Sequence, residues 1–230
     1  YRSFDRQWAL KDPRLTALER PALWKSVSDR QLFFAAPMTA SSSGGALITV
    51  SSDVPDLHYY NGRGGKDILP LYRDSASQKP NLSNGLQRAI AGILDIPNPL
   101  PEDVAAYVYS LLSAPRYQER FAANLITPGP RVPITADASL WHETVALGRE
   151  LLWLHTWAER FLDSSLGRGR TIPQIAGIGW LAQVDRMPET NADIAYDENT
   201  LRLHIGDGII TGVRADVWKY SVSGMPVVKK

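Results

Sequence analysis

The stretch from Pro101 to Phe161 decides the fold: PEDVAAYVYSLLSAPRYQERFAANLITPGPRVPITADASLWHETVALGRELLWLHTWAERF. Pro101 has the backbone angle that suits the first turn of a helix, and Glu102 and Asp103 put carboxylates at its positive end. Apolar residues then recur at helical spacing to about residue 113: Val104, Tyr107, Val108, Leu111 and Leu112. Pro115 opens a second helix, which we expect to continue to about residue 122.

A third and longer helix follows three prolines at positions 128, 130 and 133. Either Asp137 or Ser139 supplies a side-chain oxygen that can cap its first turn. A wide apolar face predicts that this helix extends past residue 160, and its members are Val145, Leu151, Leu152, Leu154, Ala158, Phe161 and Leu162. The GRGR sequence at 167–170 is then expected to end it.

The flanking regions predict a mixed α+β chain. Short apolar runs at 31–35, 46–50 and 68–72 indicate strands in a strand-rich N-terminal part, and residues 86–94 indicate a helix that ends before Pro97. The tail predicts a hairpin from 194–196 and 201–205, followed by 209–211, as a small C-terminal β-sheet. We expect one domain over residues 1–230, with a possible division into a β-rich part (1–80), a helical part (81–165) and a second β-rich part (166–230). Within the helical part, the helices are expected over about 84–165.

The composition is that of an ordinary globular protein, with 44% hydrophobic and 21% charged residues among 230. The chain has no apolar run of about 18 residues and no signal segment, so we expect no membrane contact and a cytoplasmic location. It has no cysteine, which excludes disulfides and cysteine-ligated zinc. Because it begins with Tyr1 and ends on two lysines, we expect it to be a piece of a longer protein.

Charge is distributed unevenly although the net charge is only +1. Residues 1–80 carry 11 Lys and Arg against 8 Asp and Glu, whereas residues 81–165 carry 6 against 9. Residues 166–230 carry 8 against 7. This balance is weak for an independent nucleic-acid binder, and it leaves open both an ordinary solvated surface and a domain whose neighbours supply most phosphate contacts.

Several blocks resemble one family of DNA-modifying enzymes. The pattern D-V-x-x-Y-x-Y-x-x-L-x-x-P-x-Y-x-x-R-F at 103–121, R-V-P at 131–133 and G-R-E-L-x-x-L-H at 148–155 resemble the C-terminal specificity part of large adenine-specific DNA methyltransferases fused to nucleases. YRSFDR at 1–6 is similar to a block that follows the methyltransferase domain there, with Ser3 in place of the usual proline. PDLHYY at 55–60, GRGG at 62–65, LPLYRD at 69–74 and WKYSVSGM at 218–225 resemble the Type ISP branch, which is ATP-driven.

The resemblance implies a target-recognition domain that binds double-stranded DNA for an adenine methyltransferase domain upstream in the same chain. It also implies S-adenosylmethionine, and for the ATP-driven branch ATP with magnesium, as cofactors of the parent enzyme and not of this fragment. The alternative is a structural module that couples methyltransferase to helicase and nuclease without touching a base. Binding to a cognate over a scrambled duplex distinguishes the two.

The fragment itself has no recognisable catalytic, cofactor or metal site in its sequence. It lacks a G-x-x-x-x-G-K-S/T phosphate loop, a G-x-S-x-G nucleophile turn, an Asn-Pro-Pro-Tyr block and a His-Glu-x-x-His pair. His142 and His155 lie thirteen residues apart, about 140° around a helix, so they cannot share a metal on it. We expect His155 to be a packing residue, and Trp153 and Trp157 to belong to the core or an interface.

Glycine-punctuated segments hold the residues that we expect to contact DNA, which are Asn61, Arg63, Lys66, Arg168, Arg170 and Gln174. On exposed loops these side chains suit base edges in the major groove, with Arg pairing to guanine and Asn or Gln to adenine. The competing interpretation is that the glycines only permit tight turns and the arginines are solvated turn residues.

Overall fold

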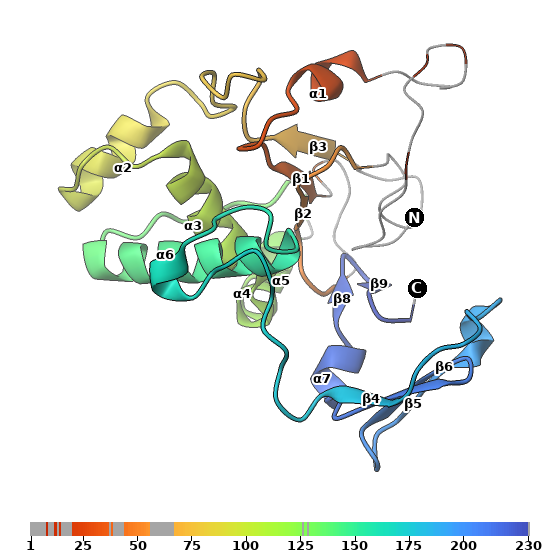
Figure 1. Ribbon diagram of the computed structural model, residues 1–230. Coiled ribbons are helices and arrows are strands. Elements are labelled where there is room, and N and C mark those ends of the chain that lie inside the picture. The colour runs from red at the N-terminus through yellow and green to blue at the C-terminus, as the bar shows by residue number, and fades with distance from the viewer. Residues whose placement is uncertain are drawn as a thin grey trace.

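The structure is a computed structural model that describes residues 8, 12, 14, 20–36, 38, 44–55, 67–125, 127 and 129–229. Helices and a small sheet form the larger part, and a second sheet near the C-terminus projects from it (Figure 1). This mixture of helices and antiparallel sheets confirms the α+β fold class. No helix in the described ranges is both long and apolar enough to cross a bilayer.

The predicted helices of the middle region are present. They are α2 (Leu86–Leu94), α3 (Pro101–Ser113), α4 (Pro115–Arg120) and α6 (Ala138–His155), with the short α5 (Ala122–Leu125) between the last two. Two short helices lie outside this region, α1 (Pro21–Lys25) and α7 (Ala215–Trp218). Asp137 is the cap of α6, because its carboxylate accepts hydrogen bonds from the backbone N–H groups of Ser139 and Leu140.

The described residues form three antiparallel sheets. The N-terminal sheet has the order β2–β1–β3, from Thr49–Ser51, Phe33–Ala36 and Asp67–Pro70, and so confirms the three predicted strands. The C-terminal sheet has the order β4–β7–β6–β5, from Gly179–Ala182, Gly208–Thr211, Arg202–Ile205 and Ile194–Asp197. The hairpin β5–β6 was predicted and β4 was not. Strands β8 (Ser221–Val222) and β9 (Met225–Pro226) form the third.

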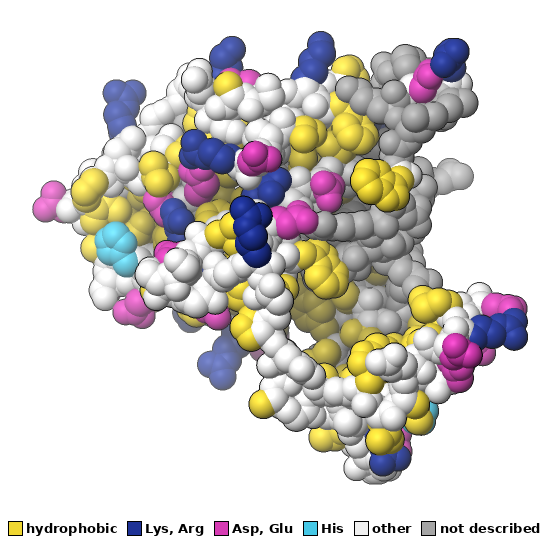
Figure 2. Space-filling model, in the orientation of Figure 1, with side chains coloured by type: hydrophobic (Ala, Val, Ile, Leu, Met, Phe, Trp, Pro, Cys, Tyr) yellow, Lys and Arg dark blue, Asp and Glu magenta, His cyan; other side chains and the backbone are white. Residues whose placement is uncertain are grey.

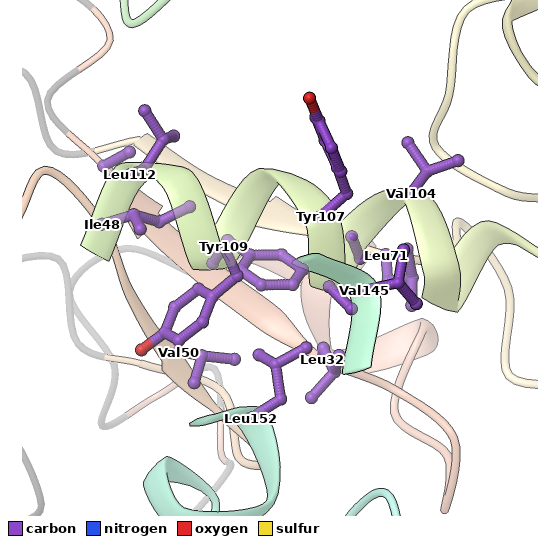
Figure 3. Packing of buried hydrophobic residues seen from close by; sticks show 14 of the residues in the cluster. Leu32, Ile48, Val50, Leu71, Val104, Tyr107, Tyr109, Leu112, Val145 and Leu152 are labelled. Carbon is purple, nitrogen blue, oxygen red and sulfur yellow. The ribbon is translucent and has the colours of Figure 1, made fainter. Parts of the chain in front are cut away.

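The core is built around the crossing of α3 and α6, with residues of the N-terminal sheet beneath it (Figure 3). Trp141 of α6 stacks on Tyr107 of α3 with ring centroids 4.4 Å apart. Gly148 allows the backbones of α3 and α6 to approach closely, because a Cβ at this position would overlap the carbonyl oxygen of Ala106. The two helices of the sequence stretch that decides the fold are therefore packed directly against each other.

The expectation that the long helix extends past residue 160 is wrong, since α6 ends at His155. Trp157 and Ala158 both have left-handed backbone angles, φ +57° and +59°, and the N–H of Ala158 bonds back to the carbonyl of Trp153. Arg160 then reaches the N-terminal part, with its guanidinium donating to the carbonyl oxygens of Gln31 (3.0 Å) and Ser28 (3.2 Å). These long-range contacts require a turn where helical periodicity alone predicted continuation.

The C-terminal strands close back on the N-terminal part. The N–H of Ala46 donates to the carbonyl of Ser221 at 2.8 Å, and the N–H of Ser223 donates to the carbonyl of Ala46 at 2.7 Å. Val222 is buried in a small cluster with Ala35 and Ala46. The strand-rich regions at the two ends of the sequence are therefore joined in space.

Candidate functional site

Three of the six predicted DNA-contacting residues, Asn61, Arg63 and Lys66, lie outside the described residues. The other three, Arg168, Arg170 and Gln174, lie on the connection that leaves α6 and descends to β4 (Figure 1). This connection joins the helical part to the C-terminal sheet, so its course determines where the three side chains are presented.

The connection begins with a closed loop between Asp163 and Arg168. The two residues exchange both backbone hydrogen bonds, N–H to carbonyl in each direction, at 2.8 Å. Inside the loop, the Asp163 carboxylate accepts from the N–H of Ser165 at 3.1 Å and from its hydroxyl at 2.6 Å. Gly167 completes the turn with a left-handed φ of +74°, which glycine adopts without steric cost.

Arg168 is buried, with a relative exposure of 7%, so the expectation that it rides on an exposed turn is wrong. Its Nη2 lies 3.4 Å from Oδ2 of Asp163, and its Nε is buried without an acceptor among the described residues. The pKa of Asp163 is lowered, first by the hydrogen bond from the Ser165 hydroxyl and also by the nearby Arg168 charge. The Arg168 side chain thus belongs to the interior of the loop.

A second anchor lies on the other side of Arg168. The indole Nε1 of Trp153 donates to the carbonyl oxygen of Gly169 at 2.8 Å. Trp153 is itself buried on α6, with a relative exposure of 4%. The backbone that precedes Arg170 is therefore tied to a rigid helix.

Arg170 and Gln174 are exposed, as predicted. Among the described residues Arg170 makes no ion pair or hydrogen bond, whereas the Gln174 amide lies 3.5 Å from the carbonyl of Ile178. Three other cations of the C-terminal part have carboxylate partners: Arg186 pairs with Glu189, Arg214 with Asp216 and Lys219 with Glu198. Arg170 is consequently a cation whose donors remain available to a ligand.

One face of the C-terminal sheet carries a continuous apolar row. Its strand register aligns Tyr196, Leu203, Ile210 and Trp180 in one row across all four strands. Trp218 of α7 stacks on Tyr196 at the β5 end of the row (5.4 Å between centroids), while Trp180 at the β4 end is 51% exposed. In the view of Figure 2, a hollow separates the C-terminal sheet from the helical part, and hydrophobic side chains lie on both sides of this hollow.

Arg202 is an exposed cation on the opposite face of the sheet and is not among the residues predicted to contact DNA. It is aligned with Asp197 on one side and Thr211 on the other. The signal was present in the sequence RLHI at 202–205, because alternation in a strand places Arg202 and His204 on the face opposite to Leu203 and Ile205. No glycine-rich turn surrounds Arg202, so the pattern that singles out the other candidates does not include it.

His155 has the packing role that was predicted. Its Nδ1 lies 2.6 Å from the hydroxyl of Tyr109, and burial lowers its pKa, which favours the neutral ring. In the part of the chain that the structure describes, no three His, Cys, Asp or Glu side chains form a group that could hold a metal ion.

A family model described as the Type ISP C-terminal specificity domain matches residues 1–229. No curated protein matches the chain. Solved structures with a similar fold include a DrdV–DNA complex determined by cryo-EM (TM-score 0.59, 19% identity) and the ATP-dependent Type ISP restriction–modification enzyme LlaBIII bound to DNA (0.55, 18%). A nuclease-deletion mutant of the Type ISP enzyme LlaGI with a DNA substrate mimic is a third (0.54, 19%).

These three similarities each cover most of the present chain, 86%, 86% and 85% respectively. The chain spans only 19%, 12% and 13% of the length of the three matched chains. At this level of identity the likeness establishes a shared fold.

Proposed function

Because this chain belongs to the family of Type ISP C-terminal specificity domains, we propose that it recognises a specific sequence in duplex DNA. It does so for an adenine-specific methyltransferase and restriction enzyme that shares its polypeptide. The observation that carries the proposal is the family match over residues 1–229. Support comes from the fold shared with DrdV and LlaBIII, which are described as bound to DNA, and with LlaGI, described in complex with a DNA substrate mimic.

In this proposal, DNA bases are recognised by side chains whose hydrogen-bond donors are not already paired within the protein. A guanidinium can donate two hydrogen bonds to N7 and O6 of guanine, and a carboxamide can pair with adenine. Arg170 and Gln174 fit these roles by exposure, and Asn61, Arg63 and Lys66 remain candidates from the sequence. Arg202 joins them as a further exposed cation.

Methyl transfer is the task of the upstream domain in this proposal. That domain binds S-adenosylmethionine and flips the adenine, and the present chain contributes the choice of site. Calorimetry of the chain with S-adenosylmethionine is therefore expected to give no heat above dilution, and saturable binding would contradict this division of labour. A protein that reads chromosomal and incoming DNA in this way acts in the cytoplasm.

The decisive experiment selects duplexes from a library with a randomised central block and sequences the bound fraction. The proposal predicts enrichment of one motif. A bound fraction as random as the input would overturn sequence recognition and favour the structural coupling module.

Variants then assign the contacts. Arg170→Ala is expected to cost about 1–3 kcal/mol at one base-pair position if Arg170 reads a guanine. If it contacts only a phosphate, binding weakens evenly across all sequences and the salt slope falls by about one unit. Arg214→Ala is the matched control, because Arg214 is also exposed but is paired with Asp216.

A further inference from the structure

Arg168 is unusual because a charged side chain is buried in a segment whose neighbours are exposed. Residues 164–167 and 169–171 are all exposed, whereas the Arg168 side chain retains only 9% of its accessible surface. Arginine is rarely buried without a structural or functional reason, because desolvating its charge is costly. The burial therefore requires a role for the guanidinium inside the loop.

Direct contact with a base does not explain this burial. A bidentate contact with guanine needs two guanidinium nitrogens presented side by side at the base edge. The Nε of Arg168 is buried and Nη2 lies beside Asp163, so the Nε–Nη2 edge of the guanidinium is not free to pair with a base. The neighbouring Arg170 satisfies the exposure requirement instead.

We propose, on the basis of the function proposed above, that Arg168 is a positioning residue that fixes the direction in which Arg170 leaves the core. Asp163 and Arg168 close the loop on one side through two backbone hydrogen bonds and one ion pair. Trp153 anchors the carbonyl of Gly169 on the other side. Arg170 follows Gly169 directly, so a single peptide bond joins the anchored Gly169 carbonyl to Arg170.

Preorganisation is the physical benefit of this arrangement. A loop that is already ordered loses less conformational freedom when it binds, and its side chains meet the base edge in one geometry. A loosened loop retains Arg170 but presents it in many directions. Loss of the anchor should therefore reduce discrimination at the base pair that Arg170 reads, with less effect elsewhere.

The test uses Arg168→Met, which retains an unbranched apolar stem but has neither the charge nor the guanidinium donors, and Arg168→Lys, which retains the charge. Both are compared with wild type and Arg170→Ala by selection from the randomised duplex library and by thermal unfolding. We expect Arg168→Met to lose about tenfold in discrimination at the base pair affected by Arg170→Ala, and Arg168→Lys to restore part of it.

The double variant with Arg168→Met and Arg170→Ala separates positioning from independent contact. Residues that act through one another give non-additive effects, so the double variant should discriminate no less than Arg170→Ala alone. Additive losses, or an Arg168→Met protein that folds and retains the full motif, would overturn the inference.

Trp153→Phe provides a second route should Arg168→Met fail to fold. This change retains a buried aromatic ring, although a smaller one, and removes the hydrogen bond to Gly169. It should lower discrimination at the same base pair, and a folded Trp153→Phe protein with the wild-type motif contradicts the role of the anchors. A wild-type protein that enriches no motif contradicts the proposed function itself and the inference with it, whereas the preceding outcomes contradict the inference alone.

Discussion

The hydroxyl of Tyr109 lies 2.6 Å from Nδ1 of His155, and this pair joins the middle of α3 to the last residue of α6. The two rings meet edge to face with centroids 5.7 Å apart. Tyr109 has no solvent-accessible surface, and His155 ends the helix at the point where the chain turns towards the N-terminal sheet. Protonation of His155 would therefore place a charge within the contact between the two central helices.

The first prediction concerns pH. Burial lowers the pKa of His155 below its ordinary value of 6.5, so the unfolded chain takes up a proton at a higher pH than the folded one. The stabilising contribution of neutral His155 is full above pH 6.5 and is lost as pH falls towards the lowered folded pKa. The free energy of unfolding, measured by denaturant titration, should therefore decline as pH falls from about 8 to about 5.

His155→Gln should flatten this decline, because the variant has no imidazole to protonate. His142→Gln, at an exposed position on the same helix, controls for the loss of a histidine as such. A His155→Gln protein with the same pH dependence as wild type would show that another group is responsible.

The second prediction concerns the crossing of α3 and α6. Gly148→Ala should destabilise the protein by about 1–3 kcal/mol, because the added methyl group meets the backbone of Ala106 and the helices must separate. Gly92→Ala on α2 is the matched control, since nothing lies within 4 Å of a Cβ there. It should stabilise by about 0.5–1 kcal/mol, as alanine favours helix over glycine. Equal effects of the two changes on the melting temperature would contradict the close approach.

The third prediction concerns the start of α6. Asp137→Ala should cost about 0.5–2 kcal/mol, because two backbone N–H groups lose their acceptor. Ser139→Ala should cost less, since its hydroxyl bonds only to the exposed Glu143 at 3.2 Å. Urea denaturation of both variants measures the difference in the free energy of unfolding. A larger loss of stability for Ser139→Ala would show that Asp137 is not the cap.

The fourth prediction concerns the strength of DNA binding by the chain alone. The excess of three cations in residues 1–80, 11 against 8, supports few phosphate contacts. Neutralising about three phosphates gives a slope near −3 for log K against log salt. Fluorescence anisotropy with a labelled duplex across a salt series tests this, and tight binding that is insensitive to salt would refute the electrostatic argument.

Local signals predicted the helices of the middle region well. Prolines at 97, 101 and 115 stand at helix boundaries. Of the predicted apolar stripe of α3, Val104, Tyr107 and Leu112 are buried, whereas Val108 and Leu111 are partly buried. The hairpin β5–β6 followed from alternation on either side of a polar turn. These elements depend on neighbours close in sequence, which is why the sequence was sufficient for them.

Strand β4 could not be predicted from local signals, because it depends on a partner strand that is distant in sequence. Its sequence GWLA is short, and a bulge between Trp180 and Ala182 disrupts the alternation that marks a strand. It is a strand because β7 is available to pair with it. Such pairing is a property of the assembled sheet.

For the candidate site too, the sequence determined some features and the tertiary structure determined others. Sequence alone identified the family through blocks distributed over the chain, and it placed Arg168, Arg170 and Gln174 on one glycine-punctuated segment. It could not distinguish the two arginines, which share the same local pattern GRGR. Only the tertiary structure buries Arg168 beside Asp163 and leaves Arg170 exposed.

What the sequence by itself determined is therefore the local structure: where α2 and α3 begin and end, where α4 begins, and which family the blocks belong to. The tertiary structure decided where the long helix stops and which arginine is available to a ligand. Arg160 is satisfied by carbonyl groups of Gln31 and Ser28, more than a hundred residues earlier, and the chain must leave the helix to reach them. Contacts between distant residues outweigh local periodicity there, because the partly buried guanidinium of Arg160 finds its acceptors in the N-terminal part of the chain.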